Sequence, residues 1–439
     1  MEKLYKRELY LSKIRGFYND PETIKVITGI RRCGKSYLLK EIYAKYLKDI
    51  GVKNENILII ELDDILNYKY RNPIRLMEYV QGLINHLSDD VYVFIDEIQL
   101  ITKIINPELT GGEIKKAKET DEDTISFVDV VLGLSRIKNV DLYVTRSNSK
   151  LLSKGVATEF RDKATEIHMR PLSFKEFYEY LGGDERAAFN EYMRHGGMPL
   201  AVLSDYDNKE QYLKNLFEPT YFKDILEYNK IRKSESLSEI CDVLSFCSGQ
   251  PLNSQKIVNI LESRKKEKIG KEAVDRYIQC FENAYLIDEA KRYDIKGGDV
   301  IGATRKYYFE DVGLRNARLD FTSLDSGQVI ENIVYNELIY NGYNVKVGTF
   351  NQVEKDKTGN SILKTYEVDF YATKGTKSIY IQVTDDITKA STKEREIRPY
   401  FLINDSILKV IVINEPIKEM KFENGILLEG ITDFLLNQM

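Results

Sequence analysis

The sequence is poor in histidine and cysteine for a chain of 439 residues. Its histidines are His86, His168 and His195, and its four cysteines, which form no C-x-x-C pair, are Cys33, Cys241, Cys247 and Cys280. Structural zinc needs clustered Cys and His ligands, and disulfides need an oxidising compartment. We therefore expect four reduced thiols, no structural zinc, and no catalytic dyad built on histidine.

The sequence also lacks long apolar runs and an excess of positive charge. No uninterrupted apolar stretch is long enough to span a bilayer, and Met1–Arg7 lacks the apolar core of a signal peptide. With 64 Lys+Arg against 69 Asp+Glu, the net charge of −5 argues against a uniformly basic nucleic-acid coat, but allows a local basic face. The composition is globular, and we expect a cytoplasmic protein of two or three domains with no membrane contact.

Strand-like and helix-like runs alternate in the first part of the chain. The strand-like runs are apolar and rich in β-branched residues, at Thr23–Thr28, Ile57–Leu62, Val91–Ile95, Asp141–Thr145 and Thr165–Arg170. Such alternation predicts an α/β fold with a parallel sheet covered by helices on both faces. We place this domain at residues 1–172, and expect the aromatic-rich helical pattern of residues 173–230 to form a lid.

The remaining sequence predicts two further modules. Residues 231–318 show three helical patterns followed by two strand patterns around a Lys-Gly-Gly turn, the outline of a winged helix. Residues 319–439 show a helix, three strands and further α/β material.

The strongest motif is an unbroken G-x-x-x-x-G-K-S at Gly29–Ser36, between the first predicted strand and an amphipathic helix. Its glycines allow a tight turn whose N–H groups face phosphates, and the following helix adds its positive N-terminal end. Lys35 can reach the β- and γ-phosphates, and Ser36 can ligate Mg²⁺. The predicted nucleotide-binding residues are Gly29, Arg31, Arg32, Cys33, Gly34, Lys35, Ser36 and Tyr37.

Two later strands end in polar residues. Val91–Glu97 ends in Asp96, which we expect to hold Mg²⁺ with Ser36, and in Glu97, which can polarise the attacking water and so favours hydrolysis over phosphotransfer. After the strand Asp141–Thr145, either Thr145 or Asn148 can orient that water; an equally good interpretation is a turn capped by Ser and Asn.

Together these residues resemble the prokaryotic AAA-type ATPases, related to archaeal-type and signal-transduction ATPases, that carry a C-terminal domain of unknown function. The matching segments are residues 27–36, 95–99, 145–152, 158–161, 171–177 and 196–200. The resemblance implies a five-stranded P-loop core, a helical lid, a winged helix and a restriction-endonuclease-like C-terminal domain, with ATP as the nucleotide. It also implies that Asn148 is a sensor, that Arg161 contacts the γ-phosphate in cis or in trans, and that Pro199 packs on the nucleotide.

The sequence departs from the family pattern at two places in the first domain. Arg146 stands where the family has glycine, and could contact phosphate or block the attacking water. The pattern Phe-Arg-Gly-Arg-Gly appears as Phe160–Ala164, with sequence Phe-Arg-Asp-Lys-Ala.

The C-terminal part resembles a restriction-type nuclease in its acidic residues. They are Glu331 and Glu337 on one predicted helix, then Glu367 and Asp369 on a strand, followed by Gln382-Val383-Thr384 on the next. In such sites carboxylates hold Mg²⁺ and a lysine activates water, but Thr384 stands at the lysine position. A binding platform is the default interpretation.

In the middle module, basic residues at 264–268 and at Lys291, Arg292, Lys296, Arg305 and Lys306 are either DNA-phosphate contacts or a solvated face.

The sequence thus predicts an Mg-ATP-dependent ATPase acting as a switch on its winged-helix and C-terminal domains, with DNA or a protein as partner. Alternatives are a nucleotide-loaded scaffold with little turnover and an ATP-gated nuclease. An Arg161 acting in trans would require a homo-oligomer.

Overall fold

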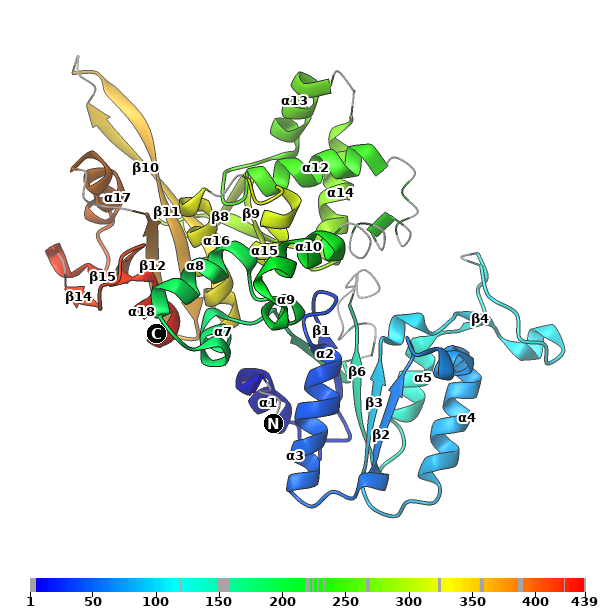
Figure 1. Cartoon of the computed structure of the whole chain (residues 1–439). Helices are drawn as coiled ribbons and strands as arrows, with labels where there is room; N and C mark the ends of the chain where they lie inside the picture. The colour runs from blue at the N-terminus through cyan, green and yellow to red at the C-terminus, as the bar shows by residue number, and fades with distance from the viewer. Residues whose placement is uncertain are drawn as a thin grey trace. The chain divides into compact units, whose positions relative to one another are not determined.

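A computed structural model of the chain contains two compact units, residues 5–170 and residues 171–439 (Figure 1). The structure describes residues 5–118, 120–147, 158, 160, 162–217, 222, 225–226, 229, 231, 234–265, 269–322, 325–355, 359–385, 390–421 and 423–437. No helix within these ranges is both long and apolar enough to cross a membrane.

The first unit is built on a five-stranded sheet in the order β2-β3-β6-β1-β7, with every neighbouring pair parallel. Its strands are β1 (Ile24–Thr28), β2 (Ile57–Glu61), β3 (Val91–Asp96), β6 (Val140–Thr145) and β7 (Ala164–His168). The predicted parallel sheet is therefore confirmed, with strand ends that differ by no more than two residues.

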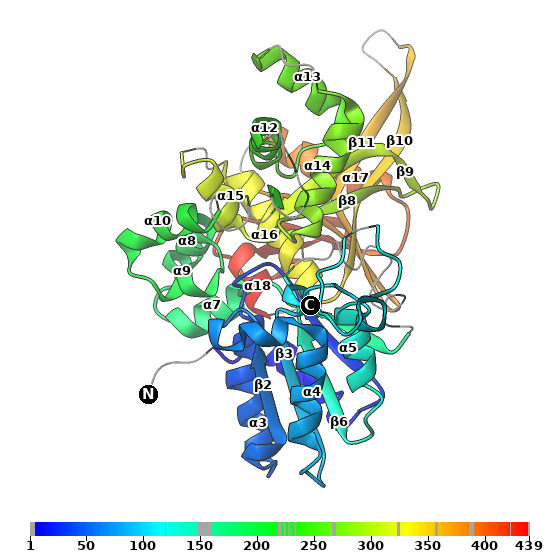
Figure 2. The same ribbon diagram turned by 90° about the vertical axis from the view of Figure 1, so that its right-hand side faces the viewer.

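Helices cover both faces of this sheet (Figures 1 and 2). On one face α4 (Pro73–Ile84) and α5 (Phe127–Leu134) pack against Val93 and Ile95 of β3. Phe94, which points the other way because strand side chains alternate, packs on Tyr43 with ring centroids 5.8 Å apart. Tyr43 belongs to a helical segment formed by α2 (Lys35–Tyr37), a π-helical stretch at Leu38–Tyr43 and α3 (Ala44–Asp49). The helix α1 (Glu8–Arg15) packs against this segment.

The second unit begins with helices and continues into a mixed sheet. Its helices are α7 (Phe174–Leu181), α8 (Glu185–His195), α9 (Pro199–Leu203), α10 (Tyr206–Leu216), α12 (Ser234–Phe246), α13 (Ser254–Lys265), α14 (Lys271–Asn283), α15 (Val312–Arg318), α16 (Ser326–Tyr340), α17 (Ala390–Leu402) and α18 (Ile431–Asn437). The strands are β8 (Ile287–Asp294), β9 (Val300–Phe309), β10 (Asn344–Lys355), β11 (Ser361–Lys374), β12 (Lys377–Thr384), β13 (Leu408–Ile413), β14 (Met420–Lys421) and β15 (Leu427–Gly430).

One sheet joins the middle and C-terminal parts of this unit. Its eight strands run β14-β15-β13-β12-β11-β10-β8-β9, so the hairpin β8–β9 forms one edge of the sheet that β10–β15 complete (Figure 1). The junction is a parallel pairing of β8 with β10, which aligns Arg292 with Val347 and Asp294 with Thr349. The sheet is thus continuous across residue 318, where the sequence pattern suggested a change of module.

Candidate functional site

The loop after β1 wraps around the Lys35 side chain. The Lys35 ammonium donates hydrogen bonds to the backbone oxygens of Gly29 and Ile30, each at 3.0 Å, and the residue is 3% exposed. Gly29 (φ 143°) and Gly34 (φ 105°) adopt backbone angles that favour glycine. A Cβ on Gly29 would lie 2.1 Å from the backbone oxygen of Met169. Glycine is therefore required at position 29 for both reasons.

The other predicted loop residues differ in exposure. Arg32 is exposed with a positive φ of 64°, and Arg31, Ser36 and Tyr37 are partly buried. Cys33 is fully buried with its Sγ 3.3 Å from the backbone oxygen of Met169, so its thiol is a core group. Any contribution of Cys33 to an anion must then come from its backbone.

Thr145 connects the two carboxylates at the end of β3. Its hydroxyl donates a hydrogen bond to Asp96 and accepts one from the backbone N–H of Glu97, at 2.9 Å. Burial raises the pKa of the Asp96 carboxyl, and hydrogen bonds from Ser36 and Thr145 partly oppose that rise. The only proton of the Thr145 hydroxyl goes to Asp96, so Thr145 links the Asp96–Glu97 pair; a role in orienting the attacking water stays a prediction.

The Glu97 carboxylate is held by two side chains that the sequence reasoning gave no role. It accepts hydrogen bonds from the Ser147 hydroxyl, at 2.9 Å, and from the Gln99 amide, which also lies 3.1 Å from the Ser147 oxygen. Glu97 itself has a positive φ of 56°. The available signal was weak, since Gln99 is only a polar residue two positions after a carboxylate.

A second addition to the site is the pair Glu61 and Asp63, at the end of β2 beside β3. One carboxylate oxygen from each of Glu61, Asp63 and Asp96 lies within 4.8 Å of the others. Hard divalent cations prefer such oxygen donors, so the chemistry of this edge of the sheet fits Mg²⁺. Glu61 also forms an ion pair with Lys40.

Arg146 lies in the core of the first unit. Its side chain is fully buried, and its guanidinium carbon lies 5.0 Å from the centroid of the Phe127 ring on α5. A cation over an aromatic face is attracted by the ring's quadrupole. The side chain therefore contributes to packing beneath α5.

Three predicted site residues are not among the described residues of the first unit. Asn148 and Arg161 are outside the described residues. Pro199 opens α9 in the second unit, just after Gly197, whose N–H donates to Asp311 at 2.7 Å. A Cβ on Gly197 would lie 2.1 Å from the backbone oxygen of Leu172. The Gly-Gly-x-Pro turn thus has a packing role inside its own unit, and its contact with a nucleotide stays a prediction.

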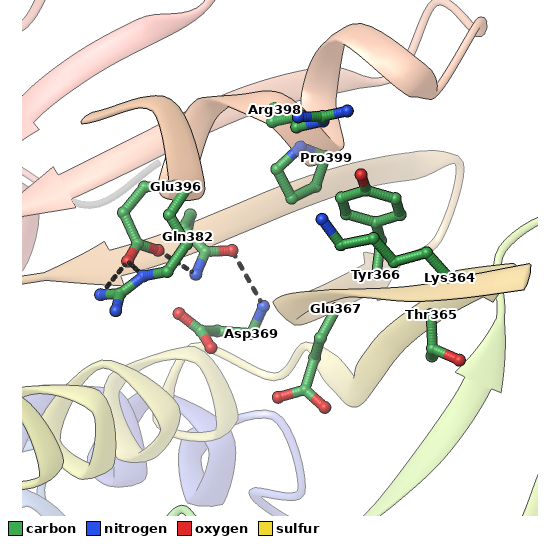
Figure 3. A pocket seen from close by; sticks show the side chains of 10 residues that line it. Lys364, Thr365, Tyr366, Glu367, Asp369, Gln382, Glu396, Arg398 and Pro399 are labelled. Carbon is green, nitrogen blue, oxygen red and sulfur yellow. Dashed lines mark hydrogen bonds and ion pairs between the residues drawn. The ribbon is translucent and has the colours of Figure 1, made fainter. Parts of the chain in front are cut away.

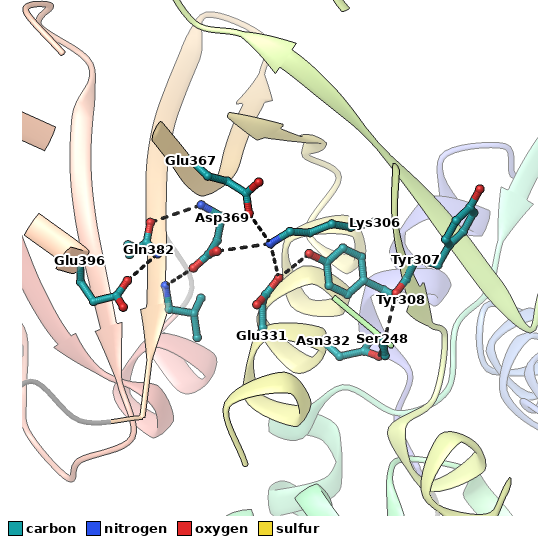
Figure 4. A network of polar contacts seen from close by, with 11 residues as sticks. Ser248, Lys306, Tyr307, Tyr308, Glu331, Asn332, Glu367, Asp369, Gln382 and Glu396 are labelled. Atoms are coloured by element: carbon teal, nitrogen blue, oxygen red, sulfur yellow. Dashed lines mark hydrogen bonds and ion pairs between the residues drawn. The ribbon is translucent and has the colours of Figure 1, made fainter. Parts of the chain in front are cut away.

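A separate polar cluster lies in the second unit, around Lys306 of β9 (Figure 4). The Lys306 ammonium lies 3.0 Å from Glu331 of α16, and 3.0 Å and 3.4 Å from Glu367 and Asp369 of β11. Tyr308 donates to Glu331 at 2.6 Å. Lys306 is therefore an internal ion-pair partner, and the interpretation of it as a DNA-phosphate contact was wrong.

Electrostatics favour a charged lysine at this position. Burial by itself lowers the pKa of Lys306, but attraction to Glu331, Asp369 and Glu367 outweighs it and raises the pKa above its usual value. Burial raises the pKa of Asp369, and repulsion from Glu331 adds to the rise while Lys306 opposes it. Among these carboxyls it is Asp369 whose raised pKa lets it keep its proton to a higher pH than an ordinary aspartate.

The cluster borders a cavity of about 520 Å³ (Figure 3). In its wall Gln382 accepts a hydrogen bond from the Asp369 N–H at 3.3 Å and donates to Glu396 at 2.7 Å. The remaining lining residues are Lys364, Thr365, Tyr366, Glu367, Arg395, Arg398 and Pro399. Thr384 is buried at the end of β12. Glu337 is not in the cluster: its carboxylate accepts from Asn341 at 2.8 Å.

The parallel sheet and its glycine-lined loop define the first unit as a P-loop NTPase fold, and comparison with known families identifies an AAA-type ATPase domain. Residues 21–178 match a family described as "AAA domain". Residues 186–325 match a domain of unknown function, DUF8612. The chain belongs to the same family as an uncharacterized protein of Haemophilus influenzae, to which it is 30% identical over 438 residues, 98% of each chain.

Two further similarities are weaker. An uncharacterized protein of Methanocaldococcus jannaschii is 28% identical over 417 residues, covering 90% of this chain and 83% of that one. Among solved structures, the ORC2 protein of Aeropyrum pernix, in ADPNP–ADP complexes, aligns with a TM-score of 0.40 and 11% identity over 77% of this chain and 96% of that one.

Proposed function

We propose that this protein hydrolyses ATP with Mg²⁺, and uses the nucleotide state as a switch on the domains that follow. The single observation that supports this most is the environment of Lys35. Its buried ammonium meets two neutral carbonyl oxygens in the loop, so its charge is left for an anion. A triphosphate at the loop would supply that anion.

In this proposal the residues at the strand ends divide the work. Ser36 and Asp96 would hold Mg²⁺, with Glu61 and Asp63 close enough to add ligands or bind its waters. Glu97 would take a proton from the attacking water, aimed by Ser147 and Gln99. Asn148 would act as sensor and Arg161 would contact the γ-phosphate, in cis or across a homo-oligomer interface.

The downstream part of the proposal rests on the resemblance. Pro199 and the helices after residue 173 would respond to the nucleotide, and the winged-helix and restriction-endonuclease-like modules would contact DNA or a protein partner. The cytoplasm is the expected compartment. The alternative of a scaffold with little turnover rested on Arg146, and that side chain packs on Phe127; this favours hydrolysis over the scaffold.

The test combines nucleotide binding with phosphate release. Calorimetry with Mg-ATP should show about 100-fold weaker binding for Lys35→Ala, because a charge-assisted contact to phosphate is lost. The control is Lys45→Ala, an exposed lysine ten residues further on. Equal affinity in Lys35→Ala and the wild type would refute the site.

Hydrolysis is tested separately with Glu97→Gln. Phosphate release should fall by about 100-fold or more, since proton transfer to a positioned base commonly contributes that much. Nucleotide affinity should stay close to that of the wild type. Exposed Glu41 supplies the matched control, Glu41→Gln. If Glu97→Gln releases phosphate at the wild-type rate, Glu97 is not the base.

A further inference from the structure

The Lys306 cluster occupies the position where the nuclease resemblance would place a metal. Glu367 and Asp369 lie on β11, and Gln382 lies on the neighbouring strand β12, as in the acidic layout found in the sequence (Figure 4). Glu331 of α16 completes the set. Three of these side chains, Glu331, Glu367 and Asp369, are carboxylates, which by their chemistry suit Mg²⁺.

The centre of that donor set is taken by the Lys306 ammonium. One nitrogen lies within 3.0 to 3.4 Å of oxygens on all three carboxylates, and the residue is 3% exposed. A dication ligated by the same oxygens would lie within a few ångströms of this positive charge and be repelled by it. The residues present therefore do not fit a bound metal while Lys306 stays in place.

The backbone holds Lys306 there. Its strand β9 pairs with β8 along Ile287–Lys291, and β8 pairs in parallel with β10 of the C-terminal sheet. Tyr308, two positions along and on the same face of β9, donates to Glu331. The β12 part of the nuclease pattern also differs. The Gln382 amide accepts a hydrogen bond from the Asp369 N–H and donates one to Glu396, and Thr384 stands at the lysine position.

We propose that Lys306 is the resident cation of this site in place of a divalent metal, so that the acidic cluster is a clamp joining the β8–β9 hairpin to α16 and β11. With its metal position filled from within the chain, the C-terminal domain cleaves no phosphodiester in this state. All residues involved lie in the second unit, so the inference stands independently of ATP hydrolysis.

The test counts Mn²⁺ bound to the full chain without nucleotide, by electron paramagnetic resonance of the free ion. Asp369→Asn should remove no Mn²⁺ from the wild type. Lys306→Met should bind about one Mn²⁺ more than the wild type, and adding Asp369→Asn should remove it. Mn²⁺ ions bound elsewhere, including near Glu61 and Asp63, contribute equally to the two proteins of each comparison, with and without Asp369→Asn, and so do not affect the difference.

Two outcomes overturn the proposal. One is that wild-type protein loses a Mn²⁺ on Asp369→Asn, or on Glu367→Gln, a milder change because that side chain is 33% exposed. The other is that folded Lys306→Met gains no Mn²⁺. Should Lys306→Met fail to fold, the wild-type comparison still decides, together with DNA incubated with Mg²⁺ and ATP. Intact DNA supports the proposal, whereas cleavage that Asp369→Asn abolishes refutes it.

Discussion

Among the buried lysines, Lys35 in the first unit and Lys306 in the second are equally hidden but have opposite surroundings. Each is 3% exposed. Lys35 meets the carbonyl oxygens of Gly29 and Ile30, whereas Lys306 meets three carboxylates. Neutral partners do not neutralise an ammonium, so its charge can attract an anionic ligand, whereas carboxylates neutralise it within the fold. Burial alone therefore does not distinguish a binding lysine from a structural one; the charge of its neighbours does.

The largest expected effect tests the structural half of this comparison. Lys306→Met leaves three carboxylates without their ammonium, and removing one partner of a buried ion-pair network costs about 3–5 kcal/mol. We expect a large drop in the unfolding midpoint in urea, with unchanged affinity for Mg-ATP. The control is Lys291→Met on the same hairpin, whose side chain is 56% exposed. Equal midpoints for the two variants would show that the cluster adds no stability.

Another buried cation, Arg146, sharpens the comparison because its guanidinium faces the Phe127 ring. Arg146→Gly removes a large buried side chain beneath α5, and we expect a loss of about 2–4 kcal/mol. Arg146→Met, which keeps much of the volume, should lose less. Unfolding in urea measures both. Faster phosphate release from an equally stable Arg146→Gly protein would contradict the core role and revive the low-turnover scaffold.

Glu337 offers a buried carboxyl without a lysine clamp, on the same helix as Glu331. Burial raises its pKa to about 7; repulsion from Glu176 adds to the rise, while Asn341 and Lys175 oppose it. The folded state thus holds a proton that the unfolded chain loses near its ordinary pKa of 4.5. The protein therefore loses stability progressively as pH rises from about 4.5 through about 7, because the unfolded chain ionises this carboxyl more easily than the folded state does.

Replacing this carboxyl by an amide should therefore stabilise the protein only at higher pH. We expect Glu337→Gln to match the wild type near pH 4.5 and to exceed it above pH 7 by at most about 3 kcal/mol. The amide oxygen can still accept from Asn341. Thermal melting from pH 5 to pH 8 measures the difference, and a gap that does not widen with pH would contradict the raised pKa.

The smallest effect tests the binding half of the comparison. Without nucleotide, Lys35→Ala should change the free energy of unfolding by less than about 1 kcal/mol, because its hydrogen bonds go to neutral carbonyls. Urea unfolding of nucleotide-free protein measures this. A loss as large as that of Lys306→Met would mean that Lys35, too, is mainly structural.

The sequence predicted local features well and long-range partners poorly. The parallel sheet and the loop at Gly29–Ser36 follow from patterns within a few residues, and both are present. Ser147 reaches Glu97 from a distant segment, so no spacing rule identified it, and Gln99, two positions after Glu97, carried no distinctive signal. Lys306 was taken for a surface residue because charge patterns do not reveal which face of a strand is covered. Likewise Glu331 and Glu337 share a helix, but only Glu331 faces β9.

The parallel pairing of β8 with β10 limits how this chain can be divided. Cutting between β9 and α16 would strip β10 of its neighbour and leave a row of unsatisfied N–H and C=O groups, a template for aggregation. A fragment that starts at the apparent module boundary is therefore a poor candidate for expression or domain shuffling. A fragment or a domain exchange should therefore keep the residues from β8 onward together, because they form one sheet.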